Sequence, residues 1–158
     1  MVSRQSIVVA IAALGVLLSV SSRPAVAADD TGLSKTANGV TVYLGVVPAQ
    51  VVKGELKPGE QPMHGRVPNA PHEYHVLAAL FDAATGARVS DATVTAQVSG
   101  LGLAGTTKKL ETMQIEGTTT YGMFFDLPGA DIYTIKFHVE RPAPARSADV
   151  EFKYDHRR

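Results

Sequence analysis

The feature that most constrains this chain is the alternation of apolar and polar residues over short segments bounded by turn residues. The segment 132–140 is typical, because Tyr133, Ile135, Phe137 and Val139 alternate with threonine, lysine, histidine and glutamate. Side chains in a β-strand point to opposite faces in turn, so this period of two predicts a strand with one buried face. Beyond the N-terminal 27 residues no segment shows the period of an amphipathic helix, and the pattern predicts an all-β domain.

About seven such strands are predicted, with turn signals at a spacing of roughly 8–12 residues. They cover residues 40–47, 72–82, 92–98, 109–115, 119–126, 132–140 and 148–154, and a further short strand could form at Gln50–Val52. This number and spacing favour a two-sheet antiparallel β-sandwich of immunoglobulin-like type over residues 39–155. A small barrel is the alternative. The chain has neither cysteine nor tryptophan, which excludes an antibody-type domain.

The segment 72–82 is the most apolar of these strands, and it follows the longest loop. Apolar residues fall on both of its faces, which predicts a strand buried from two sides over part of its length. The preceding loop, 48–71, contains five prolines and three glycines, residues that interrupt strands. A loop of this length is unusual in a compact domain and indicates either a functional segment or a disordered one.

The N-terminus has the layout of a cleaved signal peptide over residues 1–27. Arg4 supplies the positive charge, Ile7–Val20 form the apolar core, and Ala25-Val26-Ala27 is a small-residue cleavage site. The core is shorter than the roughly 20 residues of a comfortable membrane span, so a retained anchor is the less favoured alternative. We therefore expect a periplasmic or secreted protein without a membrane span, whose residues 28–38 form a flexible lead-in.

Composition excludes several classes of function. Without cysteine there can be no disulfide, thiolate metal site or lipidated N-terminus. Loss of residues 1–27 removes two arginines from a chain with 15 basic and 15 acidic residues, which leaves a formal charge of −2. This balance gives no reason to expect nucleic acid or an anionic membrane as partner.

We also expect no enzyme. Nucleophilic hydrolysis needs a serine or cysteine beside a histidine base, and the chain has no Gly-x-Ser-x-Gly sequence. The glycine-rich run 100–105 resembles a phosphate-binding loop only superficially, because such loops lead from a strand into a helix and no helical pattern follows. We interpret the run as a flexible connection.

The sharpest site hypothesis is a transition-metal site at Met63, His64, His72 and His75. These four side chains fall within thirteen residues, two in the long loop and two where the central strand begins. Imidazole suits copper, zinc and nickel, and thioether sulfur favours Cu(I), so copper is the metal we expect. A loop that folds back over its own strand would bring the four together.

Strand geometry restricts this hypothesis. His72 and His75 are three residues apart, so in one regular strand they point to opposite faces unless the strand begins after His72. The alternative is a surface His64, a loop His72 and a structural, hydrogen-bonded His75. Met113 and Met123 are expected in the core, on a hairpin whose loop is Glu116-Gly117-Thr118. His138 is expected to be solvated and His156 to lie in the tail.

The segment Phe81–Val94 resembles bacterial secreted immunoglobulin-like modules of the YtkA-like and FixH-like group. Their pattern is a strand, Asp-x-x-x-Gly, and a small residue opening a Val-x-Val strand, which here corresponds to Asp82, Gly86 and Ala92. Tyr133–Phe137 is similar to their penultimate strand, and the likeness extends over residues 72–154. Several periplasmic proteins of this shape handle copper or iron through methionine and histidine, so the resemblance implies metal binding but maps no ligand onto this chain.

Two functions follow as hypotheses. The first is a soluble periplasmic β-sandwich that binds copper for trafficking or tolerance. The second is a non-enzymatic interaction or accessory module without metal, which contacts a periplasmic protein partner through its sheet edges or its long loop.

Overall fold

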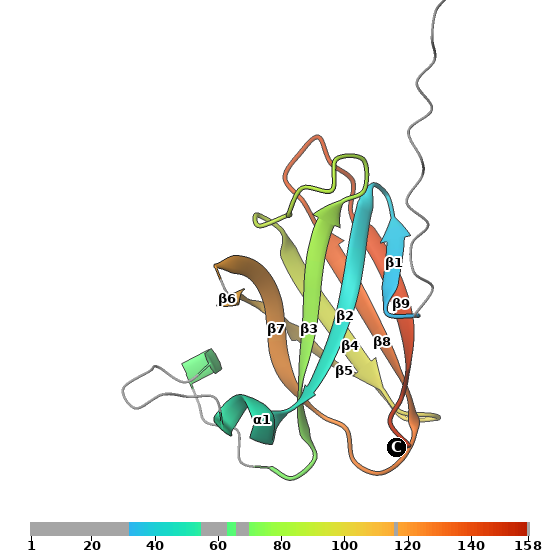
Figure 1. Ribbon diagram of the computed structural model, residues 1–158. Coiled ribbons are helices and arrows are strands. Elements are labelled where there is room, and N and C mark those ends of the chain that lie inside the picture. Colours follow the sequence, from blue (N-terminus) through green and yellow to red (C-terminus); the bar gives the residue numbers. More distant parts are fainter. Residues whose placement is uncertain (1–31, 55–62, 66–69, 116, 158) are drawn as a thin grey trace, which may run out of the picture.

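The computed structural model describes residues 32–54, 63–65, 70–115 and 117–157, and the predicted signal peptide lies outside these ranges. The described residues form two antiparallel sheets packed face to face (Figure 1). The first sheet holds, in spatial order, β1 (Ser34–Ala37), β2 (Val40–Pro48), β3 (Glu73–Asp82), β7 (Thr118–Asp126) and β6 (Glu111–Ile115). The second holds β5 (Thr106–Lys109), β4 (Thr93–Ser99), β8 (Ile132–Glu140) and β9 (Ala148–Asp155). The predicted sandwich of immunoglobulin-like type is confirmed.

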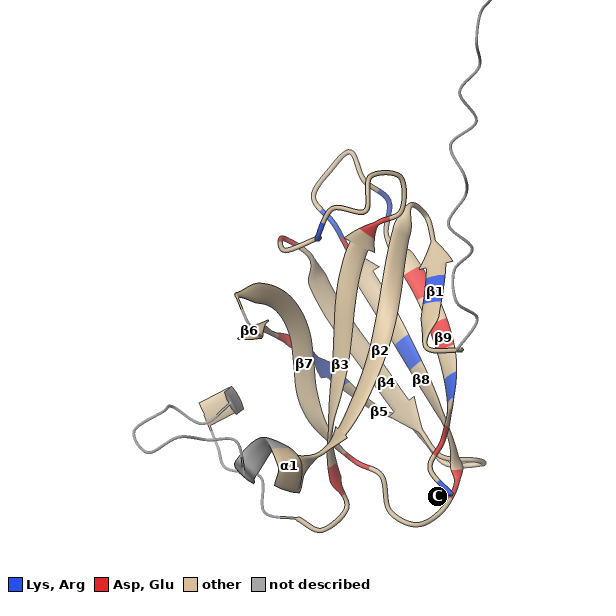
Figure 2. Ribbon diagram, viewed as in Figure 1, with Lys and Arg blue, Asp and Glu red and all other residues tan. Residues whose placement is uncertain are grey.

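The core between the sheets follows the alternation of the sequence. Every second residue of β8, from Tyr133 to Val139, is at most 4% exposed, as the pattern predicts. In β3 the residues Val76, Ala78 and Leu80 are fully buried in the same core. On the outer surface of the second sheet, basic and acidic residues are interspersed along β8 and β9 (Figure 2).

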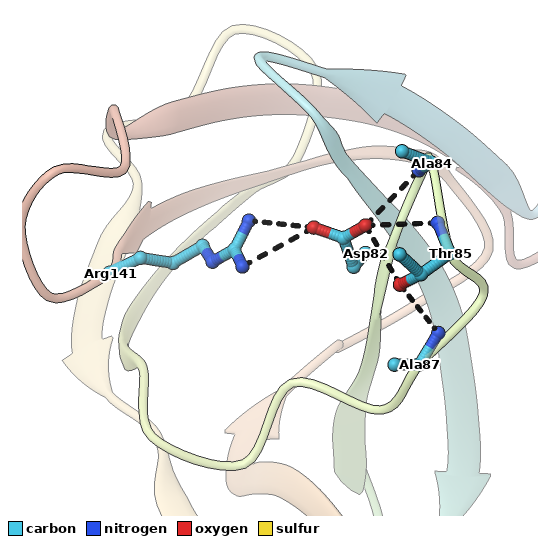
Figure 3. Close-up of polar contacts among 5 residues, drawn as sticks. All are labelled: Asp82, Ala84, Thr85, Ala87 and Arg141. Carbon is cyan, nitrogen blue, oxygen red and sulfur yellow. Dashed lines mark hydrogen bonds and ion pairs between the residues drawn. The ribbon is translucent and has the colours of Figure 1, made fainter.

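The turn after β3 has Gly86 at a φ of 71°, a conformation that glycine adopts without strain. Oδ1 of Asp82 accepts hydrogen bonds from the backbone of Ala84 and from the backbone and hydroxyl of Thr85 (Figure 3). Oδ2 accepts from two guanidinium nitrogens of Arg141, each at 3.4 Å. These bonds, those from Thr85 first, lower the pKa of Asp82. One carboxylate therefore closes the turn and ties the end of β3 to the residue that follows β8.

Two predicted boundaries are wrong. The described part of the chain holds nine strands rather than about seven, because β1 forms inside the predicted lead-in 28–38 and because β5 of the second sheet takes Lys109, the first residue of the predicted strand 109–115. Asn38-Gly39 joins β1 to β2 as a two-residue hairpin with positive φ at both positions, the arrangement for which Asn-Gly is strongly preferred. The short strand considered at Gln50–Val52 is instead part of a helix, α1 (Ala49–Gly54).

The hairpin between β6 and β7 also differs from the prediction. Ile115 pairs with Thr118, so the loop has two residues, not three. Removing one residue from the loop turns β6 over relative to β7. Met113 consequently pairs with Thr120 and lies on the outer face of the first sheet, whereas Met123 packs against the core as predicted.

Candidate metal site

The outer face of the first sheet is partly covered, and the candidate site lies under this cover. After β2 the chain forms α1, which packs against β2 and β3 (Figure 1). Ala49, at the start of α1, is buried with Phe124 of β7 in a small second cluster beside Val47. A short 3₁₀ turn, η1 (Met63–Gly65), follows α1 in the same connection between β2 and β3. The sequence predicted that the central strand, β3, is buried on both faces over part of its length. This is confirmed at the start of β3, where His75 on the outer face and Val76 on the inner face are both buried.

His64 and His75 meet under this cover. Their Nε2 atoms are 2.9 Å apart, and their rings lie edge to face with centroids 5.1 Å apart. His75 is 2% exposed and the side chain of His64 is 4% exposed. Both rings contact the ring of Phe124, with centroid distances of 5.3 Å and 4.8 Å. The two imidazoles thus form a buried pair on an aromatic floor.

The backbone of His64 is held in an uncommon conformation. Its φ of 57° and ψ of 30° fall in the left-handed region, which few residues other than glycine occupy. Such conformations persist where surrounding contacts determine them, and they cluster at functional sites. Here the contacts of the buried ring with His75 and Phe124 hold it.

Glu111 sets the protonation pattern of the pair. Its Oε2 lies 2.6 Å from Nδ1 of His64. Since a carboxylate oxygen accepts, Nδ1 of His64 donates, and Nε2 of His64 faces Nε2 of His75. Burial, together with the neighbouring His64, lowers the pKa of His75 to about 4. His75 is therefore neutral at pH 7, and one proton lies between the two Nε2 atoms.

A glycine leaves the space beside this pair open. A Cβ atom at Gly122 would lie 2.6 Å from Nε2 of His75 and 2.9 Å from the methyl carbon of Met113. Both side-chain ends therefore approach the same point over β7. The reversed facing of β6 places Met113 here, so its predicted place in the core is wrong.

The structure unites only part of the predicted set. His64 and His75 come together, and the expectation of a surface His64 is wrong. His72 precedes β3, as the hypothesis required, but its side chain is exposed to solvent. The side chain of Met63 lies outside the described residues. Over the described ranges, no group of three or more histidine, cysteine, aspartate or glutamate side chains is arranged to hold a metal ion.

Two side chains at the site, Glu111 and Met113, were not among the predicted ligands. Both lie on β6 at alternate positions, so they share a face, and Glu111 pairs with Gly122 of β7. The Glu-x-Met spacing is visible in the sequence, but it points to this site only once the hairpin register is known. Glu73, two residues before His75, is also buried on this face.

The remaining two histidines lie elsewhere. His138 is 42% exposed in its side chain, as predicted, and its Nδ1 lies 2.7 Å from Asp149, whose hydrogen bond raises the histidine pKa. His156 packs against the ring of Tyr74 at 4.6 Å between centroids and is also close to Tyr133 and Tyr154. The described residues include no helix with the length and apolar character needed to cross a membrane.

No protein-family model matches the chain, and no curated protein sequence matches it. Several solved structures do. A copper-bound variant of FetP from uropathogenic Escherichia coli strain F11 matches with a TM-score of 0.59 and 14% identity over 78% of this chain and 93% of its own. Copper-reconstituted P19 from Campylobacter jejuni matches with a TM-score of 0.57 and 14% identity, over 78% of this chain and 92% of its own. A DUF4426 family protein from Pseudomonas aeruginosa PAO1 matches with a TM-score of 0.54 and 17% identity, over 78% of this chain and 94% of its own. At these identities the likeness establishes the fold, and the resemblance to YtkA-like and FixH-like modules stays a prediction.

Proposed function

We propose that this protein binds copper in the periplasm, for trafficking or tolerance, with His64 and His75 as the central ligands. The observation that carries the proposal is the buried pair of Nε2 atoms 2.9 Å apart, with a carboxylate behind one of them. Met113 is the third side chain we assign, since its methyl end approaches the point beside Gly122 that Nε2 of His75 also approaches. Met63, adjacent to His64, keeps its place as a candidate.

The residues present fit a copper ion. Metal–imidazole bonds are about 2.0–2.1 Å long, so one ion can join two nitrogens that lie up to about 4 Å apart. The 2.9 Å separation lies within this limit. A metal would take the place of the proton between the rings, and the low pKa of His75 favours that exchange. The hydrogen bond to Glu111 holds His64 in the tautomer that offers Nε2 to a metal.

The choice of copper rests on donor chemistry and on the comparisons. Two imidazoles with a thioether are a soft set that suits copper, Cu(I) in particular, better than magnesium or calcium. FetP and P19, which share the fold, are copper-bound in their solved structures. A periplasmic location is supported by the predicted signal peptide, and FetP was itself expressed in that compartment.

The test is a competition titration of residues 28–158, which contain the whole described fold, with Cu(I) and a chromophoric chelator. We expect His64→Asn and His75→Ala each to weaken copper binding by more than the roughly 10–100-fold that is typical of losing a residue that hydrogen-bonds to a metal ligand. Asparagine is chosen at position 64 because it tolerates the left-handed backbone. His72→Ala, at an exposed histidine nearby, is the matched control and should bind as the unchanged protein does.

Two results would overturn the proposal. One is Cu(I) affinity that neither His64→Asn nor His75→Ala reduces, with both variants folded by circular dichroism. The other is an X-ray absorption spectrum of the loaded protein without nitrogen neighbours of imidazole type. Loss of a sulfur neighbour in Met113→Leu would identify the thioether ligand, whereas retention of that sulfur would remove Met113 from the site.

A further inference from the structure

Lys108 reaches from the second sheet to the first. It belongs to β5, the edge strand of the second sheet, where it pairs with Ala96 of β4. Its Nζ donates a hydrogen bond to the backbone carbonyl of Phe124 in β7, at 2.6 Å. β5 passes behind β7 in Figure 1, and the two strands are in contact. The bond therefore ties the two sheets together at this point.

The direction of the Lys108 side chain is unusual for a lysine. A lysine normally lays its apolar stem along the protein and extends its ammonium group into water. Lys108 is half-buried and directs its ammonium group at protein atoms instead, because the group also lies 5.0 Å from the centroid of the Phe125 ring. The next residue, Lys109, is exposed. Two successive residues of β7 thus fix the position of the Lys108 ammonium group.

The bond from Lys108 supports β7 where β6 does not reach. The pairing of β7 with β6 covers residues 118–122 of β7. Phe124 lies beyond this paired stretch, while on the other side of β7 it is paired with His75 of β3. Backbone carbonyls inside a protein need a donor, and here the ammonium group supplies one from the opposite sheet.

Phe124 is the residue that both histidines of the candidate metal site contact. It is fully buried, and its ring centroid lies 5.3 Å from that of His64 and 4.8 Å from that of His75. The position of the Phe124 backbone therefore decides where the aromatic floor lies under the two imidazoles. A metal site binds well only when neighbouring residues lock its ligands in place, so a shift of this floor weakens the site.

We propose that Lys108 is a positioning residue of the candidate metal site. Its ammonium group holds the backbone of Phe124, and the ring of Phe124 holds the imidazoles of His64 and His75 at a separation that one ion can join. Lys108 is not itself a ligand, because an ammonium group has no lone pair. Its effect on copper affinity rests on the proposed function, whereas its effect on the arrangement of the rings does not.

The first measurement concerns the rings and needs no metal. In residues 28–158 we expect nuclear Overhauser contacts between the ring protons of Phe124 and those of the two imidazoles. Lys108→Met keeps an apolar stem but removes the ammonium group, so these contacts should weaken or disappear. The matched control is Lys109→Met, at the exposed neighbour in β5, and it should retain them.

The second measurement is the Cu(I) competition titration of the same variants, each checked for folding by circular dichroism. Lys108→Met should bind Cu(I) about tenfold more weakly than the unchanged protein. Lys108→Arg, which restores a cationic donor, should recover part of this loss. Lys109→Met should bind Cu(I) as the unchanged protein does. If Lys108→Met does not fold, Lys108→Gln, which keeps a polar end, takes its place in both measurements.

Two results would overturn the proposal. One is a Lys108→Met variant with the ring contacts and the Cu(I) affinity of the unchanged protein, even at a lower urea midpoint, because Lys108 would then support only the fold. The other is an equal loss of ring contacts in Lys109→Met. If the unchanged protein binds no Cu(I), the proposed function fails, and the ring contacts by themselves decide whether Lys108 positions the histidine pair.

Discussion

Gly122 lies where the candidate copper site is most closely packed, and replacing it with alanine tests the geometry directly. The new Cβ atom would lie 2.6 Å from Nε2 of His75, 2.8 Å from Cδ2 of Leu77 and 2.9 Å from Cε of Met113. Non-bonded carbon atoms normally approach to about 3.5–4.0 Å, so each neighbour must move by half an ångström or more. Gly122→Ala therefore fills the site without removing any proposed ligand.

The loss of stability expected for Gly122→Ala depends on which of these neighbours can move. Leu77 and Met113 are half-buried and can rotate, but His75 is 2% exposed and shares a hydrogen bond with His64. Overpacking of this kind costs about 1–3 kcal/mol. Replacing a strand glycine with alanine returns roughly 0.5–1 kcal/mol. We expect the free energy of unfolding to fall by about 1–2 kcal/mol and Cu(I) affinity to fall by at least about tenfold.

Gly45 provides a matched control for this substitution. Gly45 and Gly122 pair with Leu77 from the two sides of β3, on the same face of the sheet. The three heavy atoms nearest to a Cβ at Gly45 all belong to Leu77, at 3.2 Å and beyond. Gly45→Ala should change the free energy of unfolding by less than about 1 kcal/mol and leave Cu(I) binding unchanged.

The assay is urea unfolding of residues 28–158 followed by far-ultraviolet circular dichroism, together with the Cu(I) competition titration. The reasoning is refuted if Gly122→Ala matches the unchanged protein in both stability and affinity. It is equally refuted if Gly45→Ala and Gly122→Ala lose the same amount of both, because the histidine contact would then have no specific effect.

Three further predictions follow from single contacts. The pKa of His75 is about 4 in the folded protein, below its ordinary value of 6.5. As the pH falls, His75 therefore binds a proton in the unfolded chain before it does so in the folded protein. The free energy of unfolding should consequently fall by up to about 3 kcal/mol as the pH drops from 6.5 to 4. Urea titrations across this range should show the slope, and His75→Phe should flatten it. Glu111→Gln should lower Cu(I) affinity about tenfold by weakening the bond to His64, and its stability should be nearly unchanged because Glu111 is exposed. Tyr121→Phe removes the hydroxyl that accepts from the backbone of Ala92 at 3.0 Å and should cost about 1 kcal/mol in urea unfolding, whereas an unchanged midpoint would contradict this role.

The candidate site could be predicted only in part. His64 and His75 stand out in the sequence as histidines near the entry to the central strand, and the structure places them together. His72 has the same residue type and a similar position, yet it lies in the turn before β3 and faces solvent. Residue type and spacing therefore indicated where to look, but the beginning of β3 decided which histidines are buried.

The sequence by itself determined that the domain is all-β and where most strands run. Alternation is a local property, because successive side chains of any strand point to opposite faces whatever surrounds it. Burial of alternate residues along β8, and of both faces of β3 near His75, could for this reason be stated from the sequence and is found in the structure. The Asn38-Gly39 hairpin was equally local, and the sequence contained its signal.

Only the tertiary structure decided which faces meet. A two-residue loop in place of a three-residue loop turns β6 over, and this moves Met113 from the core to the outer face, where Glu111 also lies. His64 and His75 meet because both rings pack on Phe124 of β7. This contact joins segments that are far apart in the sequence, so no short segment encodes it. Strands follow from neighbouring residues, whereas a site between segments depends on register and loop length, because one residue more or less reverses every side chain beyond it.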